Sequence, residues 1–125
     1  MLLGSLVLLT SPRRAAAVFP ITLTTDITTG PVSPLDRTSG ENMNCTAINT
    51  GRKAIDIGLQ LVQYDGTDYR TGATCQGVKP GAMCGLDAPG TPETVYCRIT
   101  VPFGHANKIR ATLEDTQTGS TSDAR

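Results

Sequence analysis

Four cysteines are the residues of this chain with the clearest capacity for chemistry. Cys45, Cys75, Cys84 and Cys97 form an even set in a chain of 125 residues, and in a short exported protein such a set favours disulfides. Structural zinc sites bring their thiolates in close pairs such as C-x2-C, whereas these cysteines are separated by 29, 8 and 12 residues. A C-x-x-C dithiol at the start of a helix is lacking as well. We therefore expect two disulfides, with no metal and no cofactor.

Few other residues could act in catalysis. His105 is the only histidine, so a Ser-His-Asp or Cys-His mechanism would have to use it, and a blue-copper site would need a second one. Asp65 and Asp68 in "YDGTD" could bind calcium or act as acid and base, but turn chemistry accounts for both. We expect no catalytic residue and no enzyme, and a hydrolase that uses these three residues is the least favoured alternative.

Three tyrosines could form a binding surface for a sugar or a protein, because a tyrosine ring is apolar and carries a polar hydroxyl. They are Tyr64, Tyr69 and Tyr96. Tyr96 precedes Cys97, so the two side chains point to opposite faces of one strand. The general preference of tyrosine for β-strands also explains an exposed tyrosine on a strand. The tyrosines are the candidate binding surface.

Alternation of apolar and polar residues predicts that β-strands position these side chains. The segment "AIDIGLQLVQY" (54–64) is apolar at every second position, and "ETVYCRITV" and "NKIRATLED" repeat the pattern. Shorter alternating runs surround Cys45 and cover residues 19–23, where Pro20 places the strand at a sheet edge. Asp65-Gly66 predicts a hairpin, and Pro80-Gly81 predicts a type II turn between two short strands.

Six to seven short strands separated by turns indicate an all-β protein, an immunoglobulin-like antiparallel β-sandwich, with an open barrel as the alternative. We expect the sandwich over residues 18–115, a long surface loop over 24–41 and a disordered tail over 116–125. Four cysteines allow three pairings. Because Cys45 and Cys97 both alternate onto the core side, the favoured pairs are Cys45–Cys97 and, across the Pro-Gly turn, Cys75–Cys84.

The N-terminal segment predicts export. An apolar run in "MLLGSLVLLT" is followed by Ala15-Ala16-Ala17, which fits a signal peptide over residues 1–17. The run is shorter than the roughly 20 residues that span a bilayer, and a buried strand is the alternative. Loss of Arg13 and Arg14 would change the formal net charge from zero to −2, and scattered charges do not fit nucleic-acid binding. We expect a secreted or periplasmic monomer with no membrane span after cleavage.

The succession "CTAINT", "IDIGLQLVQYDG", "KPG", "VYCRITV" and "KIRATLED" resembles the layout of small, uncharacterised exported bacterial proteins of immunoglobulin-like β-sandwich type. The resemblance covers residues 42–115; it implies a fold and carries over no catalytic residue. The sequence thus predicts a non-catalytic binding or accessory module for a protein or glycan ligand. The alternative is a structural subunit of a surface assembly, in which the strand with Phe19, Ile21 and Leu23 pairs with a neighbour's sheet.

Overall fold

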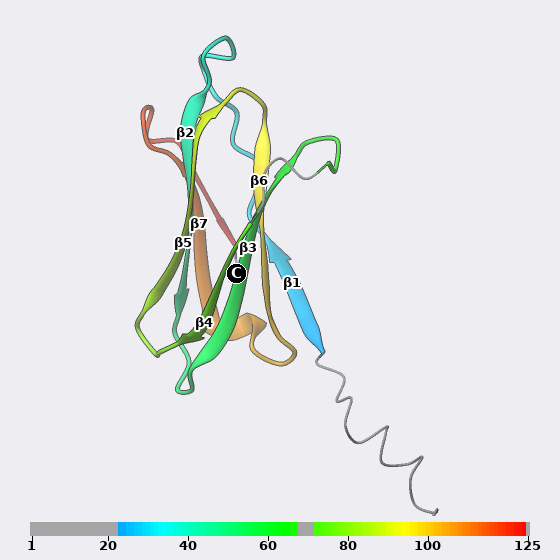
Figure 1. The fold of residues 1–125 in the computed structure, drawn as a ribbon, viewed down its shortest axis with the longest axis vertical. Coiled ribbons are helices and arrows are strands. Elements are labelled where there is room, and N and C mark those ends of the chain that lie inside the picture. Colours follow the sequence, from blue (N-terminus) through cyan, green and yellow to red (C-terminus); the bar gives the residue numbers. More distant parts are fainter. Residues whose placement is uncertain (1–22, 68–71, 125) are drawn as a thin grey trace, which may run out of the picture.

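The computed structural model describes residues 23–67 and 72–124, which form two antiparallel four-stranded sheets packed face to face (Figure 1). Sheet A has the order β1-β6-β3-β4 and sheet B the order β5-β2-β7-β8. No helix within these residues is long and apolar enough to cross a membrane. The elements are β1 (Thr24–Thr28), β2 (Glu41–Asn49), β3 (Ile55–Gln63), β4 (Ala73–Val78), β5 (Met83–Thr91), β6 (Val95–Pro102), the short 3-10 helix η1 (Ala106–Lys108), β7 (Ile109–Asp115) and β8 (Thr121–Ala124).

The core lies between the sheets and is almost entirely aliphatic. Strands β2, β3, β6 and β7 alternate buried and more exposed residues along most of their length, as the sequence pattern predicts. The expectation of an all-β sandwich is confirmed, although the described residues form eight strands instead of six or seven. The largest core side chains that are fully shielded from water are Met43, Ile57, Leu61, Ile99, Ile109 and Leu113.

The Cys45–Cys97 disulfide crosses the centre of this core. Cys45 lies on β2 and Cys97 on β6, each an interior strand of its sheet, and their Cα atoms are 6.3 Å apart. Neither residue is exposed to solvent. The predicted pairing is confirmed, and it ties sheet A to sheet B at the middle of both.

The Cys75–Cys84 disulfide is also confirmed, but its predicted setting is wrong. Its Cα atoms are 5.9 Å apart, yet β4 pairs only with β3, while β5 pairs only with β2. The Pro80-Gly81 turn closes with Ala82 N–H donating to the Lys79 carbonyl at 2.9 Å, and Gly81 has a φ of 84°, as a type II turn requires. This turn carries the chain from one sheet to the other, so the disulfide joins two edge strands instead of the arms of a hairpin.

Both ends of the described chain differ from the prediction. Strand β1 lies inside the segment 24–41 that the sequence assigned to a loop, and β8 lies inside the predicted disordered tail. The signal peptide (1–17) and the predicted edge strand up to residue 22 lie outside the described residues. Strands β1 and β8 are short and polar and lie at sheet edges, where backbone pairing with β6 and β7 holds them. Neither therefore shows an apolar alternation.

Asn49 holds together the two turns that cross between the sheets at one end of the sandwich. Its Nδ2 donates to the carbonyls of Lys53 and Val78, both at 2.8 Å, and its Oδ1 accepts from Gly51 N–H at 2.9 Å. Its backbone carbonyl accepts from Gly81 N–H at 2.7 Å. Only 1% of Asn49 is exposed, so these bonds are shielded from water and are expensive to lose.

We expect Asn49→Ala to destabilise the protein by about 3 kcal/mol, because three side-chain hydrogen bonds are lost and the Val78 carbonyl loses a buried partner. Urea denaturation measures the change. Asn107→Ala, at an exposed residue of η1, is the control and should leave the midpoint nearly unchanged. Equal midpoints for the two variants would contradict the role assigned to Asn49.

Removal of either disulfide should lower stability, and the core disulfide should matter more. Chain-entropy arguments give about 4 kcal/mol for Cys45–Cys97, which closes the longer loop, and about 3 kcal/mol for Cys75–Cys84. The two double Cys→Ala variants, compared by thermal melting, test this order. Coincident melting curves of the wild-type protein with and without a reductant would refute the dependence on disulfides.

Candidate functional site

Tyr64 and Tyr96 come from neighbouring strands and lie near each other on the outer face of sheet A. Tyr64 directly follows β3, its N–H donates to the Thr94 carbonyl at 3.0 Å, and its side chain is 79% exposed. Tyr96 on β6 is half-buried and pairs with Val62 of β3, which is fully buried. The structure thus brings two of the three predicted tyrosines together. Tyr69 lies outside the described residues.

A bulge beside Tyr96 shapes this part of the surface. After the Thr28–Arg98 pair, the chain leaves β1 but stays next to β6, and it pairs again where Val32 meets Val95. Residues 29–31 therefore oppose only residues 96 and 97, which is the one-residue excess of a β-bulge. The bulge leaves Pro31 exposed at the edge of the tyrosines.

Two adjoining hollows form around Pro31 and Tyr64. One has a volume of about 290 Å³ and is also lined by Thr28, Thr29 and Tyr96. The other has a volume of about 460 Å³. The hollows share Pro31 and Tyr64 and therefore adjoin, and we call the two together the tyrosine surface. Its residues are Thr28, Thr29, Pro31, Ser33, Arg37, Tyr64, Glu93, Thr94 and Tyr96.

Hydrogen bonds hold the polar rim of the tyrosine surface in place. Thr94 Oγ1 accepts from Arg37 Nη2 at 3.2 Å and lies 2.7 Å from Ser33 Oγ. Asp36 accepts from the hydroxyl of Ser39 and from the backbone N–H groups of Ser39 and Thr38, and these bonds lower the pKa of its carboxyl, with the Ser39 hydroxyl contributing most. These bonds close a turn over residues 36–39, which carries Arg37. A guanidinium has five N–H donors, so Arg37 can still bind a ligand oxygen.

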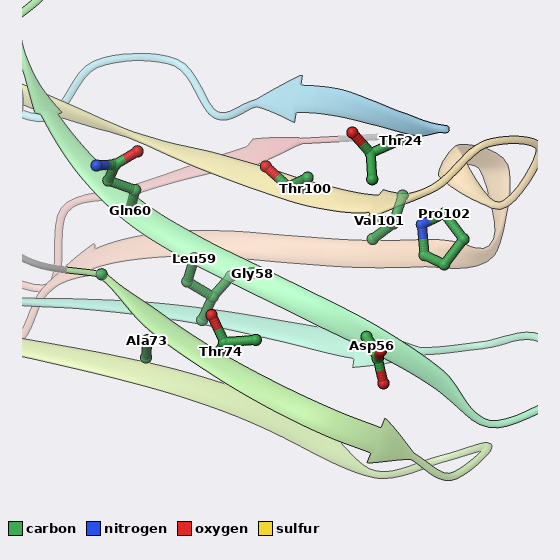
Figure 2. A pocket seen from close by; sticks show the side chains of 11 residues that line it. Thr24, Asp56, Gly58, Leu59, Gln60, Ala73, Thr74, Thr100, Val101 and Pro102 are labelled. Carbon is green, nitrogen blue, oxygen red and sulfur yellow. The ribbon is translucent and has the colours of Figure 1, made fainter. Parts of the chain in front are cut away.

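Apart from the tyrosine surface, a further hollow of about 510 Å³ lies on the outer face of sheet A (Figure 2). Its lining comes from all four strands, and a cross-strand row formed by Asp26, Thr100, Gly58 and Thr74 runs through it. Gly58 has no side chain, so the surface between Thr100 and Thr74 is low. We call this the glycine hollow. It is lined by Thr24, Asp56, Gly58, Leu59, Gln60, Gly72, Ala73, Thr74, Thr100, Val101 and Pro102.

Two carboxylates beside the glycine hollow are held by hydrogen bonds. Thr100 Oγ1 donates to Asp26 Oδ1 at 2.7 Å, and Gly77 N–H donates to Asp56 Oδ1 at 2.8 Å. Arg98 donates to Gln60 across the β3–β6 ladder, between the glycine hollow and the tyrosine surface. The outer face of sheet A therefore offers oriented acceptors and hydroxyls at one hollow and aromatic rings at the other.

Asp65 and His105, two of the three residues considered for catalysis, occupy turns. Asp65 Oδ1 accepts from Thr67 N–H at 2.8 Å, and this backbone hydrogen bond lowers the pKa of the Asp65 carboxyl. His105 is half-buried after β6, where its N–H donates to the Pro102 carbonyl at 3.1 Å. Asp68 lies outside the described residues. In the part of the chain that the structure describes, no group of three or more His, Cys, Asp and Glu side chains could hold a metal ion.

A pair of acidic residues lies at one end of the core. Glu41 is 6% exposed and Asp115 is fully buried. Asp115 Oδ1 accepts from Gln117 N–H at 3.0 Å, while its Oδ2 has no hydrogen-bond partner among the described residues. Burial raises the pKa of Glu41, and the negative charges of Asp115 and Asp36 raise it further. Both causes disfavour the charged form of Glu41.

The tyrosine surface was only partly predictable. Pro31, Arg37, Glu93 and Thr94 were not among the predicted site residues, because two of them lie in the presumed loop 24–41 and the other two precede β6. A proline and an arginine in a polar loop gave no signal of their own. Searches against protein-family models, curated proteins and solved structures found no match to this chain. The candidate function therefore rests on the geometry of the tyrosine surface and the glycine hollow.

We expect Glu41→Gln to stabilise the protein at neutral pH. Because the folded-state pKa of Glu41 is raised, the folded chain holds that proton more tightly than the unfolded chain. The contribution of Glu41 to stability is therefore greatest below its unfolded pKa of about 4.3 and is lost as the pH rises through the folded-state pKa. Glutamine stays uncharged throughout, so the gain in melting temperature should be clear at pH 7 and small at pH 4.

Glu114→Gln serves as the control for this effect. Glu114 directly precedes Asp115 on β7, but its side chain points to the outer face of the strand, so the variant removes the same charge outside the core. Melting curves of both variants across this pH range separate the local effect from a general change in charge. A Glu41→Gln variant that is less stable than wild type at pH 7 would contradict the predicted cost of the buried charge.

Proposed function

We propose that this protein is a non-catalytic binding module that acts outside the cytoplasm and binds its ligand at the tyrosine surface. The observation that carries the proposal is that two adjoining hollows share Tyr64 and Pro31. Ligand sites commonly combine an apolar, often aromatic lining with a few placed polar groups. Tyr64, Tyr96 and Pro31 supply the lining, while Arg37 and Glu93 supply charges of both signs.

The chemistry of this surface suits a sugar ring or a protein side chain. The exposed ring of Tyr64 can stack on an apolar face of the ligand. Arg37 can donate hydrogen bonds and Glu93 can accept them, and Ser33 and Thr94 already fix the rim between them. Ser33 follows the Val32–Val95 bridge, Tyr64 follows β3, and Thr94 directly precedes β6, so the sheet fixes the positions of these three residues.

The disulfides support a location outside the cytoplasm. All four cysteines are paired, and such bonds persist in oxidising compartments such as the periplasm or the extracellular space. A disulfide between the interior strands of two packed sheets is compatible with an immunoglobulin-like arrangement. Export through a signal peptide over residues 1–17, a relationship to small exported bacterial proteins and a monomeric state are parts of this proposal.

The experiment is capture of ligands from extracellular and envelope extracts of the source organism, with wild-type protein and variants immobilised side by side. Tyr64→Ala should weaken binding by about 2 kcal/mol, or about thirtyfold in Kd, as loss of a central aromatic contact does. Phe103→Ala is the matched control, because Phe103 is an aromatic residue that is 68% exposed but lies outside the tyrosine surface.

The proposal predicts a protein or glycan that is retained by the wild type and by Phe103→Ala but not by Tyr64→Ala. A ligand retained equally by all three proteins would place the binding site elsewhere. Failure to recover any reproducible ligand would count against a binding module altogether.

A further inference from the structure

We propose that the tyrosine surface and the glycine hollow are two subsites for one ligand, a neutral linear oligosaccharide that lies along β3 and β6. This inference rests on the proposed binding role of the tyrosine surface and names its ligand class. It adds the glycine hollow, which that function does not require. Its basis is the arrangement of both hollows on a single face of sheet A.

The two hollows follow each other along the same pair of interior strands. Tyr64, which directly follows β3, lies six positions after Gly58, a length of about 20 Å in an extended strand. An elongated ligand of several sugar units can reach both. The cross-strand pairs along this path are Gly58–Thr100, Gln60–Arg98 and Val62–Tyr96, followed by the Tyr64–Thr94 hydrogen bond.

The side chains along this path match a ligand that carries many hydroxyl groups. The hydroxyls of Thr24 and Thr74 can both donate and accept, and Gln60 offers an amide. The Thr100 hydroxyl already donates to Asp26 and can still accept. The Asp56 carboxylate accepts hydrogen bonds, and Gly77 N–H already holds one of its oxygens. A sugar ring presents several hydroxyls around a ring with an apolar face, and Tyr64 and Tyr96 provide the aromatic contact for that face.

Other linear ligands fit this face less well. A peptide strand cannot pair with β3 or β6, because each already has a neighbouring strand on both sides. An anionic polymer would meet the carboxylates of Asp56 and Asp26 at the glycine hollow. A cationic chain would gain from these carboxylates but would meet Arg37 at the tyrosine surface. A neutral polyhydroxyl chain avoids both conflicts.

Gly58 offers a direct way to block one subsite and leave the fold intact. A Cβ atom at this position would lie 3.6 Å from Thr100 Cβ and 3.8 Å from the Thr100 carbonyl oxygen, which are ordinary contact distances. A glutamine at position 58 can therefore be accommodated by the backbone and would occupy the glycine hollow. Gly85→Gln is the matched control: Gly85 lies on the outward side of β5 in sheet B, and a Cβ there also finds space.

The experiment measures binding of cellobiose, cellohexaose, chitobiose and chitohexaose by calorimetry and by amide chemical shifts. A heparin-derived hexasaccharide and hexalysine are the anionic and cationic probes. At least one neutral hexasaccharide should bind about tenfold more tightly than its disaccharide, since the second subsite adds contacts without a second association. Gly58→Gln should remove that advantage and leave binding of the disaccharide unchanged, while Tyr64→Ala should weaken both. Gly85→Gln should match the wild type.

The outcomes separate this inference from the proposed function. If a disaccharide and its hexasaccharide bind with equal affinity and Tyr64→Ala abolishes both, the glycine hollow is not a second subsite. The tyrosine surface would then remain as a binding site. Binding only of hexalysine or only of the heparin fragment would overturn the neutral ligand class. Failure of every saccharide to bind would overturn the inference, while ligand capture by the tyrosine surface would still be decided by the extract experiment.

Discussion

The Cys45–Cys97 cross-link is the constraint on which the remaining structure depends. It joins the interior strands β2 and β6 through the middle of the core. The chain has no tryptophan and five aromatic residues in total, and its buried hydrophobic residues are almost all aliphatic. A core of this kind supplies limited stability in a small domain. The covalent link compensates by restricting the unfolded chain, and it sets which faces of β2 and β6 point inward.

That inward orientation determines which residues form the proposed binding face. Once Cys97 points into the core, Tyr96 and Arg98 must point outward, and the β3–β6 register then places Val62 and Gln60 beside them. The bulge after β1 opens space next to Tyr96 and brings Pro31 to its edge. The tyrosine surface thus follows from two features: the alternation of inward and outward side chains along β6, and the bulge that follows edge strand β1.

The sequence predicted the parts of the fold that depend on apolar alternation. Strands β2, β3, β6 and β7, both disulfides and the outward position of Tyr96 all follow from that pattern, because burial of alternate residues leaves a direct trace in residue type. Strands β1 and β8 left no such trace, since polar edge strands are held by backbone pairing. The Pro80-Gly81 turn was identified correctly, but local sequence does not distinguish a hairpin from a crossing between sheets.

The alternation of apolar and polar residues could not predict which distant parts of the chain meet at the site. Thr94 interacts with Ser33 and Arg37, which precede it by 61 and 57 residues, and no periodic signal links such positions. Their contact depends on the path of the chain after the bulge, where Val32 rejoins β6. A single extra residue before Val32 determines that path, so the polar half of the site follows from tertiary structure alone.

Gly58 differs from Gly40 and Gly72 because neither the backbone conformation nor the packing requires a glycine there. Gly40 has a φ of +78°, and a Cβ there would lie 2.5 Å from the Gly90 carbonyl carbon, while a Cβ at Gly72 would lie 2.1 Å from the Leu59 carbonyl oxygen. The backbone requires glycine at both positions. Gly58 has neither constraint, and a glycine within a strand costs about 0.5–1 kcal/mol. In interior strand β3 it leaves a low surface between Thr100 and Thr74, which is the second subsite in our proposal.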